Sequence, residues 1–236
     1  MKKSIPFLVL LVLLTTGCGD YQRVVPLGGT DYLPLKEDLT LRYRLTYYGD
    51  VEEYSMRLRY LGGKDYKVYK AYYKGDAQGG LEFSSHNQQV AAITQYSLTS
   101  LGSRYERGDF QQVWIDESLQ PGDFWQDADT GTQTVFVGYE DITVPAGTFT
   151  DCYKTATEAL PELVDSINAR FDRKEMDSEM FNQELENAKI VVSRWFARDV
   201  GLVKEQFGTS EYVRELLAVE NEGWYTKPST SSTEEQ

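Results

Sequence analysis

Side chains that could carry out catalysis are few in this sequence, and His86 is the only histidine. A serine or cysteine nucleophile activated by a histidine base would have to use it. His86 lies in a polar run, residues 84–89, which is typical of a turn between two strands. The chain contains no Ser-x-x-Lys or Gly-x-Ser-x-Gly motif and no phosphate-binding loop. The sequence therefore predicts a protein that is not an enzyme, with no catalytic residue and no cofactor.

Metal ligands are also poorly represented. Asp127 and Asp129 could offer oxygens to calcium, but a hand-type loop would need a glutamate where Gly138 stands. We interpret this stretch as a solvated acidic loop and predict no metal site. Cys152 is the only cysteine besides Cys18, which leaves no pair for a cysteine zinc site. Because Cys152 follows a strand pattern, we interpret it as a small buried apolar residue.

Cys18 is the residue to which the sequence assigns a chemical role. Lys2 and Lys3 precede an apolar run, residues 5–14, that is much shorter than the roughly 20 residues needed to cross a bilayer. Residues 15–18 (Thr-Thr-Gly-Cys) then resemble the bacterial lipobox. The resemblance implies cleavage before Cys18 and a thioether-linked diacylglycerol on it. Each buried CH₂ contributes about 0.8 kcal/mol, so two or three acyl chains would anchor the protein to a membrane.

The same segment predicts where the protein works. Removal of residues 1–17 as a lipoprotein signal peptide implies export to the bacterial cell envelope, with attachment to a membrane through the lipid. The residue after Cys18 is Gly19 rather than Asp. By resemblance to lipoproteins of bacteria with two membranes, this favours the outer membrane over the inner one.

The charge of the chain excludes one class of partner. The net charge is −13, and it becomes −15 when Lys2 and Lys3 leave with the signal peptide. Such a charge opposes contact with nucleic acid, so we expect no DNA or RNA partner.

Composition divides the mature chain into three parts. Residues 18–36 are interrupted by Gly and Pro and are predicted to be a tether. Residues 37–226 are predicted to form a single β-rich domain, a suitable length for one large sheet. Residues 227–236 have no apolar pattern and are predicted to be a disordered tail.

Alternating apolar and polar residues predict the strands of that domain. Residues 39–47, 54–60 and 66–73 alternate in this way and are joined by short links, which favours an antiparallel meander. Further strands are predicted at residues 81–85, 90–96, 110–115, 134–139, 151–155, 190–196, 202–207 and 212–219. The predicted fold class is mainly β, with one large curved antiparallel sheet or a partly closed barrel.

A helical insertion interrupts the strands at residues 158–188. Leu163, Ile167 and Phe171 recur at helical spacing, and a second short helix is expected to begin near residue 177. Its apolar stripe must be covered, and we expect it to cover the open face of the sheet. A movable lid over a cavity is the alternative interpretation.

Several motifs carry a resemblance to a known family. They are residues 31–35 with 41–43, residues 119–125, residues 144–152 and residues 195–204, of which Val-Pro-Ala-Gly-Thr-Phe and Val-Gly-Leu-Val-Lys are the most specific. In this order they resemble a group of uncharacterised bacterial envelope lipoproteins, the TapB-like proteins, over residues 31–207. The resemblance implies an antiparallel half-barrel like that of the envelope lipoprotein carriers. It implies no catalytic residues.

Two classes of function fit these observations. In the first, the concave face of the sheet binds or carries a hydrophobic small molecule. The residues predicted to line such a site are Leu41, Tyr43, Leu45, Met56 and Leu58. In the second, the protein is an envelope scaffold that contacts another envelope protein, with the acidic helices as one candidate surface. The sequence does not predict an oligomeric state.

Overall fold

The computed structural model describes residues 28–63, 67–75, 80–95, 111–127, 130–208 and 212–220. The predicted signal peptide, Cys18, Gly19 and residues 227–236 lie outside these ranges. The elements are β1 (Gly28–Gly29), β2 (Pro34–Leu35), β3 (Thr40–Tyr47), β4 (Asp50–Gly62), β5 (Lys67–Gly75), β6 (Gly80–His86), β7 (Gln89–Gln95), β8 (Gln111–Asp116), β9 (Phe124–Asp127), β10 (Thr132–Val144), β11 (Gly147–Ala159), α1 (Pro161–Asp172), α2 (Ser178–Ala188), β12 (Val192–Ala197), β13 (Gly201–Phe207) and β14 (Tyr212–Glu220).

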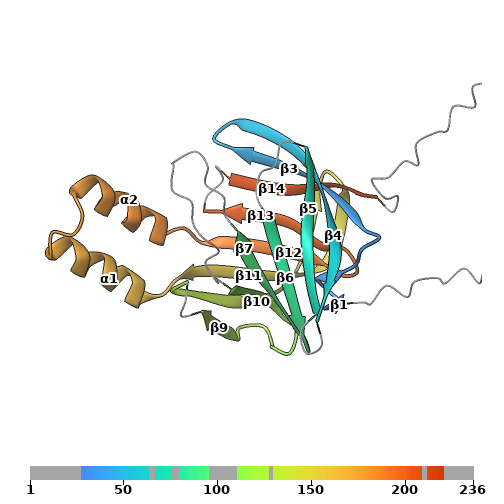
Figure 1. The fold of residues 1–236 in the computed structure, drawn as a ribbon, viewed down its shortest axis with the longest axis horizontal. Coiled ribbons are helices and arrows are strands. Elements are labelled where there is room, and N and C mark those ends of the chain that lie inside the picture. The colour runs from blue at the N-terminus through green and yellow to red at the C-terminus, as the bar shows by residue number, and fades with distance from the viewer. Residues whose placement is uncertain are drawn as a thin grey trace, which may run out of the picture.

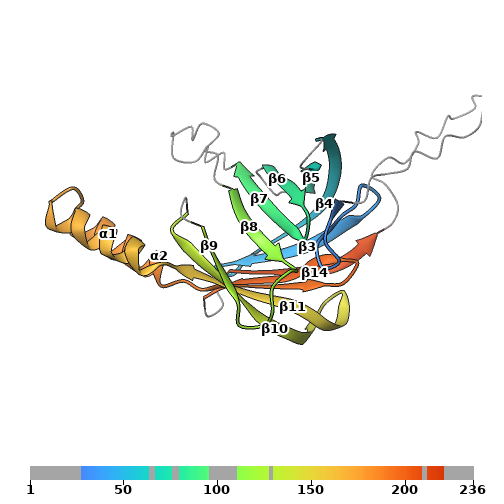
Figure 2. The ribbon, with the colours of Figure 1, turned by 90° about the horizontal axis from the view of Figure 1, so that it is seen from below.

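One twelve-stranded antiparallel sheet dominates the fold, in the order β8-β7-β6-β5-β4-β3-β14-β13-β12-β11-β10-β9. The sheet curls so that its two arms, β3 to β8 and β9 to β14, face each other across the core (Figures 1 and 2). The result is a nearly closed barrel with two short helices, which confirms the predicted fold class.

Strands β3 and β4 show why the alternating pattern produces this sheet. Leu41 and Tyr43 are buried, whereas Arg42 between them is exposed, as expected for a strand with one face on the core. At the turn, Tyr48 and Gly49 have φ angles of 47° and 92°. Positive φ at both positions is the geometry of two-residue hairpins that match the twist of the strands. The predicted meander is confirmed, since β4 pairs antiparallel with both β3 and β5.

Side chains bridge the gap between the two ends of the sheet, where β8 and β9 are the edge strands. The indole Nε1 of Trp125 in β9 donates a hydrogen bond to the Val113 carbonyl of β8, at 3.1 Å. The hydroxyl of Tyr153 in β11 donates to the Asp116 carbonyl, at 2.7 Å, and this bond is buried. At this gap, individual side-chain hydrogen bonds hold the two ends of the sheet together. They stabilise the contact less than the continuous backbone hydrogen bonds between paired strands would.

The helical insertion forms a hairpin that projects beyond the end of the barrel (Figures 1 and 2). Phe171 of α1 stacks on Phe181 of α2 with ring centroids 4.3 Å apart, and Arg170 pairs with Glu184 at 2.7 Å. The expectation that these helices cover the sheet is therefore wrong, because their apolar residues cover each other. Among the described residues, no helix has the length and apolar character needed to cross a membrane.

The segment predicted to be the second half of the tether lies inside the barrel. Leu33 and Leu35 are buried in the main hydrophobic core, and β1 pairs with β2 to make a tight loop. The Tyr32 amide donates to the Glu117 carboxylate at 2.6 Å. The tether prediction is therefore wrong for residues 28–35: Gly and Pro prevent a long strand there, but the apolar side chains between them still gain from burial. We call residues 30–35 the plug segment.

Candidate functional site

Of the residues considered first for chemistry, the structure describes His86, Asp127 and Cys152. His86 ends β6 and is exposed, and Asp129 lies outside the described residues. Cys152 is fully buried and its thiol donates to the Phe149 carbonyl at 3.6 Å. Burial, together with nearby carboxylates, raises the pKa of Cys152 to about 11, which disfavours the reactive thiolate. Within the described ranges, no cluster of three or more metal-ligating side chains occurs.

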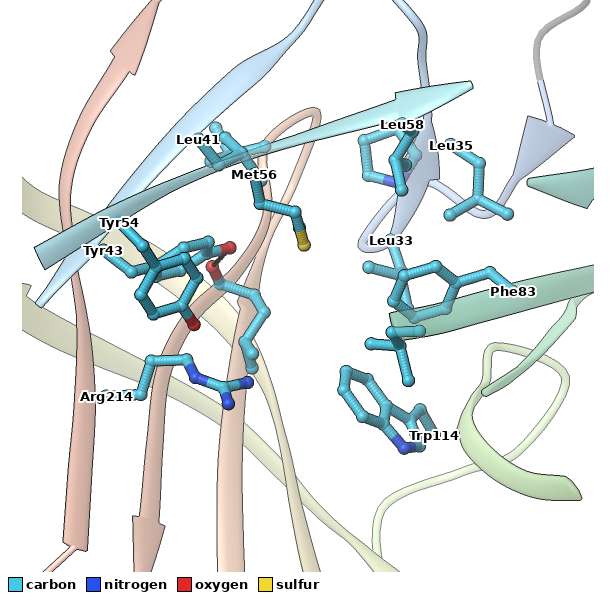
Figure 3. A pocket seen from close by; sticks show the side chains of 14 residues that line it. Leu33, Leu35, Leu41, Tyr43, Tyr54, Met56, Leu58, Phe83, Trp114 and Arg214 are labelled. Atoms are coloured by element: carbon cyan, nitrogen blue, oxygen red, sulfur yellow. Dashed lines mark hydrogen bonds between the residues drawn. The ribbon is translucent and has the colours of Figure 1, made fainter. Parts of the chain in front are cut away.

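A small pocket lies inside the barrel, between the plug segment and the inner face of the sheet (Figure 3). Its volume is about 30 Å³, enough for one or two water molecules. The lining residues are Leu33, Pro34, Leu35, Leu41, Tyr43, Tyr54, Met56, Leu58, Leu81, Phe83, Trp114, Val200, Leu202 and Arg214. All but three of these side chains are wholly apolar or indole, and the polar ones come from β3, β4 and β14.

The structure brings together most of the residues predicted to line a ligand site. Leu41 and Tyr43 of β3 and Met56 and Leu58 of β4 all line the pocket, because the antiparallel register points alternate residues of both strands inward. Leu45 is not among the lining residues and packs, partly buried, against a second core cluster. Whether these side chains contact a ligand stays a prediction.

A cluster of three charged residues, of which Glu205 and Arg194 are buried and Arg214 is partly buried, adjoins the pocket. Glu205 of β13 accepts a hydrogen bond from the Arg194 Nε of β12 at 2.7 Å, and its other carboxylate oxygen lies 3.2 Å from Nη1 of Arg214 in β14. The Glu205 side chain is only 3% exposed, and that of Arg194 is 7% exposed. The cluster holds two positive charges and one negative charge, so one positive charge is in excess.

The ionised states of the cluster support one another. Burial alone would raise the pKa of Glu205, but the guanidiniums of Arg214 and Arg194 hold that pKa below its usual value. Burial alone would lower the pKa of Arg214, but the Glu205 carboxylate raises it well above the usual value. Glu205 and Arg214 are therefore both charged at neutral pH.

Arg214 joins the charged cluster to the pocket. Its Nη2 donates to the Tyr212 hydroxyl at 3.1 Å, and its guanidinium lies 6.0 Å from the centroid of the Tyr54 ring. The whole side chain is 21% exposed, yet its Nε is buried and has no hydrogen-bond partner among the described residues. Figure 3 shows the guanidinium beside Tyr54, across the pocket from Phe83 and Trp114.

The pocket therefore has an apolar side and a polar side. The Tyr43 hydroxyl donates to the Leu202 carbonyl at 2.8 Å, and burial raises the pKa of Tyr43 well above its usual range. Burial likewise raises the pKa of Tyr54. Both tyrosines are thus neutral at neutral pH, and Arg214 supplies the charge of the polar side. A pocket of this kind suits a molecule with an apolar body and one polar group.

Sequence reasoning missed the three charged residues, although the strand pattern contained a signal. Arg214 lies two residues from Tyr212 and from Leu216, so it shares their inward face. Arg194 is likewise two residues before the buried Phe196. A charged residue at one of the alternate strand positions that are otherwise apolar is expected to point inward. The oppositely charged residue that pairs with it cannot be identified without the strand order.

Known proteins of similar structure share little sequence with this chain. No protein-family model matches the chain, and no curated protein is significantly similar to it in sequence. Two solved structures align with it: a candidate exported protein with a YmcC-like fold from Bacteroides fragilis (13% identity, TM-score 0.45) and a candidate lipoprotein from Parabacteroides distasonis (15% identity, TM-score 0.46). Each alignment covers 81% of this chain and 99% of the other. Neither similarity assigns a function, and the TapB-like resemblance stays a prediction.

Proposed function

We propose that this chain is a lipid-anchored, non-enzymatic protein of the bacterial cell envelope that binds a hydrophobic small molecule inside its barrel. The observation that carries the proposal is the pocket between the plug segment and β3, β4, β6 and β8, which is apolar except at one side. Apolar pockets with a few convergent polar groups are the usual form of small-molecule sites. The anchor would keep this site close to the lipids from which such a molecule could come.

The size of the pocket indicates how a ligand would enter. About 30 Å³ is far below the roughly 300–1,000 Å³ of typical ligand sites, so an acyl chain needs more space. Leu33, Pro34 and Leu35 line the pocket but belong to the plug segment, outside the twelve-stranded sheet. Displacement of the plug segment would enlarge the pocket without breaking the sheet. We therefore infer that the ligand and the plug segment compete for the same space.

The position of the plug segment links the pocket to the anchor. Thr30, where the plug begins, follows Cys18 by twelve residues. Twelve residues reach at most about 40 Å when fully extended. A lipid on Cys18 would thus hold the plug segment within that distance of the bilayer surface.

Replacement of Cys18 by Ser is expected to release the protein from membranes, because no thioether-linked lipid can then form. The measurement is fractionation of envelopes with a high-pH wash, together with incorporation of labelled palmitate. Cys152→Ser is the control and should behave as the natural chain does, since Cys152 is buried in the barrel. Retention of Cys18→Ser in the washed membranes, or its continued labelling, would contradict the anchor.

The ligand itself should co-purify with the chain. The full-length protein, extracted from envelopes and freed of loose lipid by gel filtration, is expected to yield about one hydrophobic molecule per chain on solvent extraction, measured by mass spectrometry. Leu58→Trp, which fills the pocket, should abolish this signal at a stability cost of about 1–3 kcal/mol. Leu61→Trp is the matched control, because Leu61 lies on the same strand and is 50% exposed.

A second candidate function is favoured by one observation. The helical hairpin of α1 and α2 projects from the barrel (Figure 1). Met180 of α2 is 46% exposed, which suits contact with another envelope protein. The same purification separates the two candidates. An empty barrel that co-purifies with a stoichiometric protein would support the scaffold function and contradict the binding function.

A further inference from the structure

We propose that the molecule bound in the barrel is an amphiphile with a single terminal carboxylate, and that Arg214 binds this carboxylate. The inference rests on the proposed function and adds the chemical class of the ligand. It follows from the charge balance of the cluster, from the Arg214 Nε that has no hydrogen-bond partner among the described residues, and from the position of Arg214 at the pocket.

The charge balance comes first. Arg194 and Arg214 both contact Glu205, and no other carboxylate among the described residues lies against either guanidinium. Glu215, the neighbour of Arg214 in the sequence, pairs with Lys204 at 3.6 Å. Neighbouring residues of a strand point to opposite faces, so Glu215 faces away from Arg214. Among the described residues, this cluster thus carries one positive charge in excess. A buried unpaired charge is unfavourable, and a bound anion would compensate it.

The excess charge faces the pocket through Arg214 rather than Arg194. Arg194 donates to Glu205 and Thr157, its guanidinium lies 4.7 Å from the centroid of the Trp114 ring, and it is not among the residues that line the pocket. Arg214 lines the pocket directly and keeps a buried Nε without a partner. A guanidinium N–H that donates to a carboxylate forms one of the stronger hydrogen bonds in proteins.

The excess of one charge also limits the headgroup. A fatty-acid carboxylate and the phosphodiester of a phospholipid each carry one negative charge. The phosphodiester also carries a second polar substituent, which would lose its hydration beside Tyr43, Tyr54 and Leu202. The carboxylate is terminal, so its apolar chain can extend past Leu58 toward Phe83 and Trp114 (Figure 3). The carboxylate is therefore the better match.

The test compares ligands that differ only in the headgroup. The lipidated chain, in nanodiscs of phosphatidylcholine, is titrated at neutral pH with decanoate, decanol and decanoyl lysophosphatidylglycerol, and empty nanodiscs correct for partitioning. Decanoate is expected to bind at least about tenfold more tightly than either other ligand. Equal binding of decanoate and decanol would overturn the carboxylate assignment, as would tighter binding of the lysolipid. Absence of binding by all three would overturn the proposed function itself.

Variants of Arg214 test the role of that residue. Arg214→Met keeps the apolar stem but removes the charge, and it should lower the affinity for decanoate about tenfold while leaving that for decanol unchanged. Equal weakening of both ligands would show that Arg214 only maintains the fold, which overturns its assigned role. Arg214→Lys keeps the charge and should retain a preference for decanoate; loss of that preference in a folded Lys variant would likewise overturn the charge argument. The comparison of decanoate with decanol on the natural chain needs no variant.

Discussion

Replacement of Glu205 by Gln is expected to lower the free energy of unfolding by about 3–5 kcal/mol, because it leaves the buried guanidinium of Arg194 and the partly buried guanidinium of Arg214 without a counter-charge. The Glu205 side chain is 3% exposed and contacts both Arg194 and Arg214, so solvent can compensate little of the loss. Gln has nearly the same volume, which separates the effect of charge from that of packing. Urea unfolding followed by circular dichroism measures the difference.

Glu215→Gln is a matched control, because Glu215 belongs to the neighbouring residue pair of the same two strands. Lys204 pairs with Glu215 in the register directly beside Glu205 and Arg214. The Glu215 side chain is 28% exposed, and Glu215→Gln should change stability by no more than about 1 kcal/mol. Similar losses for the two substitutions would show that the buried cluster has no special role in stability.

The pH dependence of stability gives a second readout for the same substitution. The pKa of Glu205 in the folded protein lies below its ordinary value of 4.5, because Arg214 and Arg194 outweigh the effect of burial. A lowered folded pKa contributes stability above the unfolded pKa, and this contribution is lost as pH falls through the folded pKa. The difference between the natural chain and Glu205→Gln should therefore be constant near neutral pH and shrink below about pH 4. A difference that grows on acidification would contradict the assigned ionisation state.

The barrel could be predicted largely from the sequence, because half-buried strands alternate in a way that is visible residue by residue. Strand β9 (Phe124–Asp127) was missed, since four residues are too few for alternation to stand out. The two helices were predicted, but their projection away from the barrel was not. Stacking of Phe171 on Phe181 satisfies their apolar faces locally, and nothing in the helical spacing distinguishes that contact from packing on a sheet.

The candidate site was only half predictable for a similar reason. Inward-facing residues of β3 and β4, such as Tyr43 and Met56, follow from a local pattern. The plug segment has no such pattern, because it is short, contains Pro34 and directly follows Gly28 and Gly29, and its burial depends on space left by distant strands. Pairing of Glu205 with Arg194 and Arg214 depends on the order β12-β13-β14, which only the assembled sheet establishes.

Leu35→Ala is expected to lower the free energy of unfolding by about 2–5 kcal/mol and, at the same time, to strengthen the binding of decanoate. Leu35 is fully buried and lines the pocket, so its truncation removes core contacts and leaves a cavity. If the ligand replaces the plug segment, weaker packing of the plug lowers the free energy needed to displace it. Each 1.4 kcal/mol of lost plug stability then appears as an affinity gain of up to about tenfold. The measurements are urea unfolding and decanoate titration on the same nanodisc preparation.

Leu61→Ala is the control for Leu35→Ala, because it makes the same chemical change at a position that is 50% exposed. It should alter stability by less than about 0.5 kcal/mol and leave decanoate binding unchanged. Competition between the plug and the ligand predicts opposite signs for the two readouts of Leu35→Ala. A loss of stability with unchanged or weaker decanoate binding would mean that residues 30–35 are permanent core, and the barrel would then have no room for an acyl chain. A hydrophobic molecule that co-purifies would in that case have to bind elsewhere on the protein.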